Sequence, residues 1–470
     1  MAYWLRDRGF EAYAVSGGHA ALRGSREAAA PETPGPAAVG AIRSALAALR
    51  HRRFRIYSAG YLFSLTGNWV EATAFGYVVL LLGGSAASLG LIGFLNTIPN
   101  LIWGLPAGAL ADRHDPRKLL LLFQGANMLV AIALAVLWAT DALTVPLMGA
   151  LAVVGGSLGT LSFPAFQRTL ASTVPEEDLE TAVAINSLSL QLARFVGPAI
   201  AGVLLAASGP TAVFVVNAFS FLAVLIAVAL LPGSRVAAAM SSLGGAMKEG
   251  LAYVFGQRSI ASLMILTLLG GVFGTPPIAF MLPGIVEFQL DAGAATLGAL
   301  TACIGLGSLL GSILMLFLAR RVNKGEPILA GFFLTGIAIC IVGASTSIPL
   351  SLAMAVIGGF SGVVFVGLST VTVQAMSSDE MRARAMAIWA AAFVGLLPFG
   401  ALITSGLAAW LGAGGAVLVD GLIMLAGGLA VLVTRPELKW LGCAALPEAC
   451  WAGTAPAAVA MEERSEAPAR

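Results

Sequence analysis

The chain has 470 residues, of which 58% are hydrophobic and 11% are charged. Soluble domains carry charge on roughly a quarter of their residues, so this composition excludes an ordinary soluble protein. The formal net charge of +2 says little about function, and no basic face of the kind that binds nucleic acid is present.

Residues 1–50 are rich in Ala, Gly, Arg and Glu and contain no continuous apolar core, so they are not a secretory signal. We expect a disordered cytoplasmic tail, and a misassigned start codon is the alternative. Twelve apolar segments follow, each long enough to cross ~30 Å of hydrocarbon as a helix. They are residues 56–82, 88–111, 119–139, 146–170, 182–207, 211–231, 259–286, 295–318, 327–345, 348–373, 384–409 and 414–433.

Lysine and arginine occur on one side of this series of segments. They lie before the first segment and after every second one: Arg50, Arg52, Arg53, Arg55, Arg113, Arg117, Lys118, Arg168, Arg235, Lys248, Arg258, Arg320, Arg321, Lys324, Arg382, Arg384, Arg435 and Lys439. The alternate loops contain neither residue type. Because basic loops stay in the cytoplasm, the pattern predicts an even number of spans and two cytoplasmic termini in a bacterial inner membrane.

The segments divide into two groups of six. A less apolar linker with a short amphipathic helix, residues 234–258, separates residues 51–233 from residues 259–435, and 436–470 read as a disordered cytoplasmic tail. The loop and helix start at 174–185 recur at 377–388, and each of the two following helices has a proline near its middle, Pro198 and Pro398. The repeat predicts two similar six-helix bundles.

A charged turn follows the second segment and carries Gly108, Asp112, Arg113, Arg117 and Lys118. The pattern Gly-x-x-x-Asp-Arg-x-x-x-Arg-Lys resembles the signature loop of the major facilitator superfamily of transporters. The resemblance implies an all-α membrane protein with twelve transmembrane helices in two pseudo-symmetric bundles. It also implies that Asp112 locks the halves together by facing the N-terminus of helix 11, where a helix dipole stabilises a carboxylate. A turn that only sets topology is the alternative. The second copy of this loop has Ala319 in place of the aspartate.

Further segments resemble one branch of this superfamily, which contains enterobactin exporters and macrolide efflux proteins. They are Asn68-Trp69, Pro164-Ala165, and the stretches at 174–179, 184–188, 193–199 and 249–254. The resemblance covers about residues 45–435 and implies proton-driven export of amphipathic small molecules.

Glu71 and Arg194 are the charged residues that lie deepest in the predicted hydrocarbon. At 1.5 Å of rise per residue, both lie about 18–23 Å from the cytoplasmic edge. An unpaired charge at this depth is costly, so we expect the two side chains to form an ion pair. In one hypothesis Glu71 carries the coupling proton, and in the other the pair is purely structural. Asp420, nearer the outer end, is either a second proton site or a residue of the outer vestibule that faces water.

Gly197, Pro198 and Gly202 resemble the helix-5 motif of antiporters, where they suit either a pivot or tight packing. Several polar and aromatic residues are candidates for lining a central cavity, with interhelical hydrogen bonding as the alternative role for the amides: Asn68, Trp69, Phe75, Asn96, Asn100, Asn127, Asn186, Gln191, Asn217 and Trp389. All the amides lie in the first half, whereas the second half is nearly all apolar. One polar wall and one lipophilic wall suit an amphipathic ligand better than a sugar.

The sequence therefore predicts a proton-coupled exporter of drugs, macrolides or siderophores that works as a monomer. Its partners are the substrate, protons and lipid, and its energy source is the proton-motive force. We expect no enzyme activity, cofactor, metal or nucleic acid, because no phosphate-binding loop, nucleophile–base set or metal-ligand spacing is present. A lysophospholipid flippase of the same fold and a membrane sensor or scaffold without transport are the alternatives.

Overall fold

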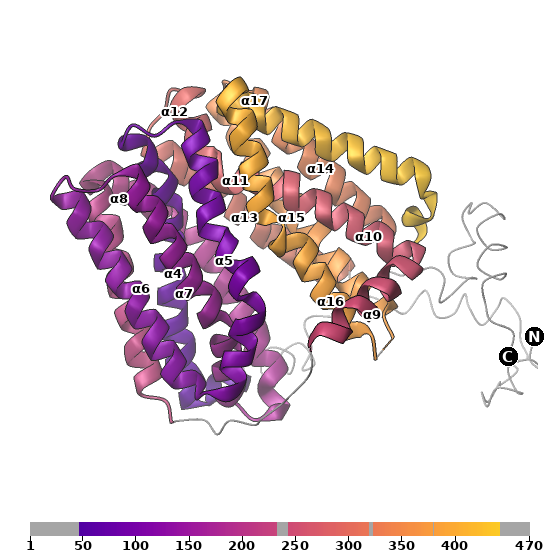
Figure 1. Ribbon diagram of the computed structural model, residues 1–470, viewed down its shortest axis with the longest axis horizontal. Helices are drawn as coiled ribbons and strands as arrows, with labels where there is room; N and C mark the ends of the chain where they lie inside the picture. Colours follow the sequence, from indigo (N-terminus) through magenta and orange to yellow (C-terminus); the bar gives the residue numbers. More distant parts are fainter. Residues whose placement is uncertain (1–46, 233–242, 319–322, 379, 442–470) are drawn as a thin grey trace, which may run out of the picture.

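The computed structural model describes residues 47–232, 243–318, 323–378 and 380–441 (Figure 1). Residues 1–46 and 442–470 of the predicted tails, the first part of the linker and most of the second signature loop, including Ala319, lie outside these ranges. The inner ends of the two predicted tails are described and form short 3-10 helices, Ala47–Arg50 and Pro436–Trp440, so the expected disorder is wrong there. Every regular element in the described residues is helical. The helices of the first half are α4 (Arg52–Leu81), α5 (Ala86–Arg113), α6 (Pro116–Ala139), α7 (Val145–Ser172) and α8 (Leu179–Ala229).

Local sequence signals explain where these helices begin. The side chains of Ser85, Asp115 and Thr144 each accept a hydrogen bond from a backbone N–H in the first turn of α5, α6 and α7. Such N-caps satisfy donors that have no partner within the helix. Pro116 follows Asp115 at the first helical position, where its fixed φ suits the helix and its missing N–H costs nothing.

The second half begins after α9 (Leu243–Gly256), which lies in the predicted linker. Its helices are α10 (Arg258–Leu269), α11 (Thr275–Phe280), α12 (Leu282–Phe288), α13 (Ala294–Leu318), α14 (Gly325–Ala344), α15 (Ile348–Met376), α16 (Arg382–Ala390) and α17 (Leu397–Thr434). The predicted span 259–286 is not one straight helix, because a π-helical stretch at Gly270–Gly274 and a break at Met281 interrupt it.

Two helices bend at a glycine near the predicted outer surface. Gly209 in α8 has φ +74°, and Gly412 in α17 has φ +73°. Only glycine adopts this conformation at little cost. Each bend falls between two spans that the sequence predicts as separate, at the same place in the two halves. The shared bend supports the internal repeat.

Nine segments of the described residues are long and apolar enough to cross a membrane. Two of them, Glu176–Ala229 and Arg382–Thr434, contain the glycine bends and have 54 and 53 residues, enough for two crossings each at 1.5 Å per residue. The α4 helix is as long as the others but is not among the nine. The predicted number of twelve spans fits this arrangement if α4 also crosses.

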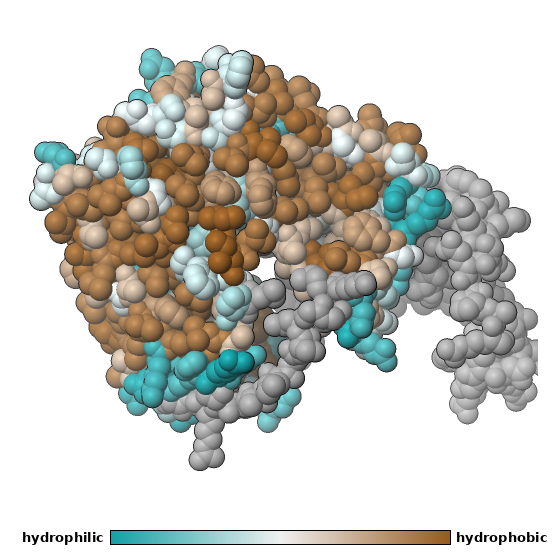
Figure 2. Space-filling model, viewed as in Figure 1, coloured by the Kyte–Doolittle hydropathy of each residue, from teal (hydrophilic) through white to brown (hydrophobic). Residues whose placement is uncertain are grey.

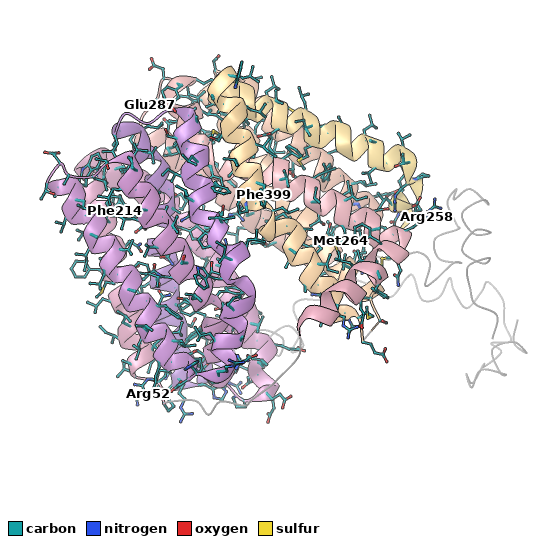
Figure 3. All side chains as sticks on the ribbon, viewed as in Figure 1. Arg52, Phe214, Arg258, Met264, Glu287 and Phe399 are labelled. Atoms are coloured by element: carbon teal, nitrogen blue, oxygen red, sulfur yellow. The ribbon has the colours of Figure 1, made fainter. Side chains whose placement is uncertain are left out.

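The two halves form a V (Figure 1). We call the end that carries Arg52 the basic end, and Figure 3 shows it opposite Glu287. The halves meet toward Glu287, where Ser405 of α17 donates a 2.5 Å hydrogen bond to the carbonyl of Ala87 in α5. They separate toward the basic end. There α9 packs on α16, with an ion pair between Glu249 and Arg384.

Candidate functional site

A cavity of about 940 Å³ lies between the two halves. Figure 2 shows the hollow between them from the side. Toward Glu287 the cavity is closed, because Phe280 packs on Gly93 and Pro283 packs on Gly76. Its lining extends in the other direction to Tyr61 and Met315. The volume is in the range of pockets that hold drug-sized ligands.

The two walls of the cavity differ in chemistry. Every charged or amide side chain in the lining comes from the first half: Asn68, Glu71, Asn96, Asn100, Gln124, Asn127 and Arg194. The second half contributes apolar side chains and glycines, with four hydroxyls as its polar groups: Thr275, Thr301, Ser308 and Thr335. The structure therefore confirms the predicted polar and lipophilic walls.

Six of the ten residues predicted to line the cavity do so: Asn68, Trp69, Phe75, Asn96, Asn100 and Asn127. Gln191 instead bridges the halves, donating a 2.8 Å hydrogen bond to Ser312 of α13. Trp389 stacks behind Phe393 with 5.5 Å between ring centroids, and Phe393 is the residue that reaches the cavity. Asn186 is also outside the lining. These three placements are wrong because helical position alone does not reveal which face of a membrane helix meets the cavity.

Glu71 and Arg194 both line the cavity, but the expected ion pair between them is wrong. No nitrogen of Arg194 lies within 4.0 Å of a Glu71 oxygen. Instead Asn217 of α8 donates a 2.5 Å hydrogen bond to Oε2 of Glu71. The guanidinium of Arg194 stacks over the ring of Trp69, 5.5 Å from its centroid.

Asn217 belongs to a small polar network that ties α4 to α8. Its Oδ1 accepts a 2.9 Å hydrogen bond from Ser220. Gly67 lies against both residues, so closely that a Cβ there would come within 2.0 Å of Ser220 Oγ. Asn217 is thus the partner of Glu71 and lies outside the cavity lining, which corrects its predicted place in the cavity.

The signature turn is held within its own half. Arg168 of α7 forms an ion pair with Asp112 and donates a 3.0 Å hydrogen bond to the carbonyl of Ala111. Arg117 donates a 2.5 Å hydrogen bond to the carbonyl of Ala229, whereas Arg113 and Lys118 are exposed and Gly108 has open space beside it. The expected contact of Asp112 with helix 11 is absent from this arrangement, because the halves are apart at the basic end.

The helix-5 motif serves close packing. A Cβ on Gly197 would lie 2.6 Å from the Cβ of Trp69, and one on Gly202 would lie 2.9 Å from the Cα of Gly298 in α13. Pro198 is buried beside them. The motif therefore lets α8 pack closely against α4 through Gly197 and against α13 of the second half through Gly202.

Asp420 is fully buried in the second half and does not line the cavity. Its Oδ2 accepts a 2.6 Å hydrogen bond from Thr404, and its Oδ1 has no partner. The hypothesis of a vestibule residue that faces water is therefore wrong. In the described residues, no group of three or more His, Cys, Asp or Glu side chains is placed to hold a metal ion.

The sequence profile of the family described as transmembrane secretion effector, a branch of the major facilitator superfamily, matches residues 43–463. The chain belongs to this family. Known relatives include the multidrug efflux pump Tap of Mycolicibacterium fortuitum, 24% identical over 397 residues that cover 81% of this chain and 95% of that protein. Macrolide efflux protein A of Streptococcus pyogenes is 24% identical over 79% of this chain and 93% of its own length.

A further relative matches over a shorter region. The staphyloferrin A transporter of Staphylococcus aureus is 31% identical over 176 residues, which cover 37% of this chain and 44% of that protein. The family and its relatives make this chain a multi-pass membrane transporter.

Solved structures agree on the fold. A D-xylose–proton symporter aligns with a TM-score of 0.65 at 16% identity, covering 82% of this chain and 98% of its own. A bacterial homologue of the human lysosomal transporter Spinster, in an inward-facing and unoccupied conformation, aligns with a TM-score of 0.64 at 14% identity over 83% and 98%. At these identities the likeness establishes the fold alone.

Proposed function

We propose that this transporter exports amphipathic small molecules across a bacterial inner membrane, in exchange for protons and by alternating access. The observation that carries the proposal is the cavity, whose polar wall comes from one half and whose lipophilic wall comes from the other. A ligand with one polar and one apolar side satisfies both walls, whereas a sugar would leave its hydroxyls facing the lipophilic wall without partners. Relatives named as drug and macrolide efflux proteins support the export direction.

Glu71 is the proposed carrier of the coupling proton. It is the sole carboxylate of the described cavity lining, and it lies in the second half of α4, nearer Leu81 than Arg52. One proton that crosses about 100 mV of membrane potential supplies ~2.3 kcal/mol. Asn217 holds the carboxylate from the second crossing of α8, so a change in the charge of Glu71 acts directly on the packing of α4 and α8.

Proton release in proteoliposomes tests this proposal. The purified protein is reconstituted with a pH-sensitive dye inside the vesicles, and erythromycin is added under an imposed pH gradient. We expect native protein to show proton flux that depends on erythromycin, and Glu71→Gln, which keeps the shape and an acceptor for Asn217, to lose it. Glu287→Gln, which removes an exposed carboxylate at the opposite end, is the matched control and should retain native flux.

The possible results separate the parts of the proposal. Flux that survives in Glu71→Gln would overturn the coupling role of Glu71. Erythromycin accumulation that ignores the pH gradient in native protein would overturn proton coupling altogether. Movement of labelled lysophospholipid in the same vesicles, without movement of erythromycin, would identify a flippase instead.

A further inference from the structure

Arg194 is a cation in the cavity without an acidic partner. Among the described residues, no Asp or Glu lies within 4.0 Å of the Arg194 guanidinium. The Arg194 side chain also forms no hydrogen bond with any described residue. Other arginines do have partners: Arg168 and Arg384 form ion pairs with carboxylates, and Arg117 donates a hydrogen bond to a backbone carbonyl. Since Glu71 is bonded to Asn217, the acid expected to neutralise Arg194 is engaged elsewhere.

The stacking on Trp69 leaves the guanidinium ready to bind a ligand. The ring of Trp69 covers one flat face of the group, 5.5 Å from its centroid. The N–H donors of a guanidinium point outward in its plane, so stacking leaves all five of them unused. Such a fork binds a carboxylate or a phosphate through two parallel hydrogen bonds. Trp69 itself is fixed, because Gly197 of α8 packs against its Cβ.

Arg194 also lies where the two halves touch. A Cβ on Gly305 of α13 would come within 2.5 Å of the Arg194 carbonyl oxygen. In the cavity wall beside this contact, Leu297 and Ile304 of α13 are apolar, and the hydroxyls of Thr301 and Ser308 donate hydrogen bonds to carbonyls of their own helix. A ligand held by Arg194 therefore places its apolar body against the opposite half.

We propose that Arg194, stacked on Trp69, is the anchor for an anionic oxygen group on the transported molecule, so that the preferred substrates are amphipathic oxyanions. This inference rests on the proposed function and names the substrate class of the same cavity. The oxyanion belongs to a carboxylic acid with a bulky apolar body or to a single-chain phospholipid. Both present anionic oxygens to the arginine fork, and the experiment distinguishes them.

Ligand-induced stabilisation tests the anchor. Fusidic acid, ionised at neutral pH, and its uncharged methyl ester have nearly the same apolar body. Purified protein is heated in detergent with increasing amounts of each compound, and binding raises the apparent unfolding temperature. Because a charge-assisted hydrogen bond contributes about 1.5–3 kcal/mol, we expect the acid to bind at least about tenfold more tightly than the ester.

Variants of the anchor show whether Arg194 is responsible. Arg194→Gln should bind acid and ester equally, and Arg194→Lys, which keeps the charge without the fork, should retain part of the preference. Arg52→Gln removes an exposed arginine at the basic end and should keep the full preference. If Arg194→Gln does not fold, the comparison of acid and ester in Arg194→Lys and native protein still decides the matter.

The outcomes are distinct. Equal binding of fusidic acid and its ester by native protein, or an unchanged preference in Arg194→Gln, would overturn the anchor. Native protein that moves protons with erythromycin but ignores the carboxylate would retain the proposed function and overturn this inference alone. Lysophosphatidate provides the second arm: tighter binding of this lipid than of fusidic acid, dependent on Arg194, assigns the site to lipid, and the reverse order assigns it to a soluble acid.

Discussion

Gly202 of α8 and Gly298 of α13 pack backbone against backbone, across the contact between the two halves of the transporter. A Cβ on Gly298 would come within 2.5 Å of the Gly202 Cα. Small residues let membrane helices approach this closely. Gly305 repeats the arrangement farther along α13, against Arg194 and Phe195. The seam between α8 and α13 is therefore formed by glycines, and any larger side chain there separates the halves.

Enlarging this seam should destabilise the observed arrangement. We expect Gly298→Val to lower the free energy of unfolding by about 1–3 kcal/mol, because overpacking forces the backbones apart. Unfolding temperature and efflux rate measure the effect. Gly406→Val is the control, since Gly406 has open space beside it and should tolerate the change. An equal loss of stability and efflux in both variants would show that close packing at the seam does not stabilise the protein.

The ion pair of Asp112 with Arg168 gives a second prediction. Both side chains are about one third exposed, 32% and 37%, and such pairs contribute less than about 1 kcal/mol to stability. We expect Asp112→Asn to reduce efflux while the unfolding temperature hardly changes. The double variant Asp112→Arg with Arg168→Asp restores the pair. Full efflux in that double variant would show that Asp112 needs only this partner, and would contradict a role against helix 11.

We expect Asn217 to support proton coupling through its hydrogen bond to Glu71. Asn217→Leu removes the donor to Oε2 of Glu71, and a buried polar group left without its partner costs about 1–3 kcal/mol. We expect lower thermal stability and loss of the proton flux that accompanies erythromycin. Ser220→Ala, which removes only the hydrogen bond to Oδ1 of Asn217, is the matched control and should keep the flux. Normal coupling in Asn217→Leu would argue that Glu71 needs no support from α8.

Asp420 should be dispensable for coupling. It is buried away from the cavity and its one hydrogen bond, from Thr404, suits an amide oxygen equally well. We therefore expect Asp420→Asn to retain erythromycin-dependent proton flux and native thermal stability. Lost flux with normal stability would return Asp420 to the list of proton carriers. The same vesicle assay that tests Glu71 provides the measurement.

Much of the fold follows from the sequence because the bilayer imposes it. A segment in hydrocarbon must satisfy its own backbone hydrogen bonds, so apolar length predicts helices. The same argument puts breaks between the predicted segments at 208–210 and at 410–413, and the structure has the positive-φ glycines Gly209 and Gly412 there. The composition of the two cavity walls was also predictable, because the amides expected to face the cavity all lie in the first half of the chain.

The partners of the buried polar groups were decided by the tertiary structure alone. Glu71 and Asn217 are 146 residues apart, and no spacing or local pattern relates them. Depth in the membrane predicted an ion pair of Glu71 with Arg194, which is wrong because amides and aromatic rings at similar depth compete for each charge, as Asn217 and Trp69 do. The rotation of α4 and α8 about their axes selects among these candidates. That rotation depends on packing at Gly67 and Gly197, so it emerges only when both helices are in place.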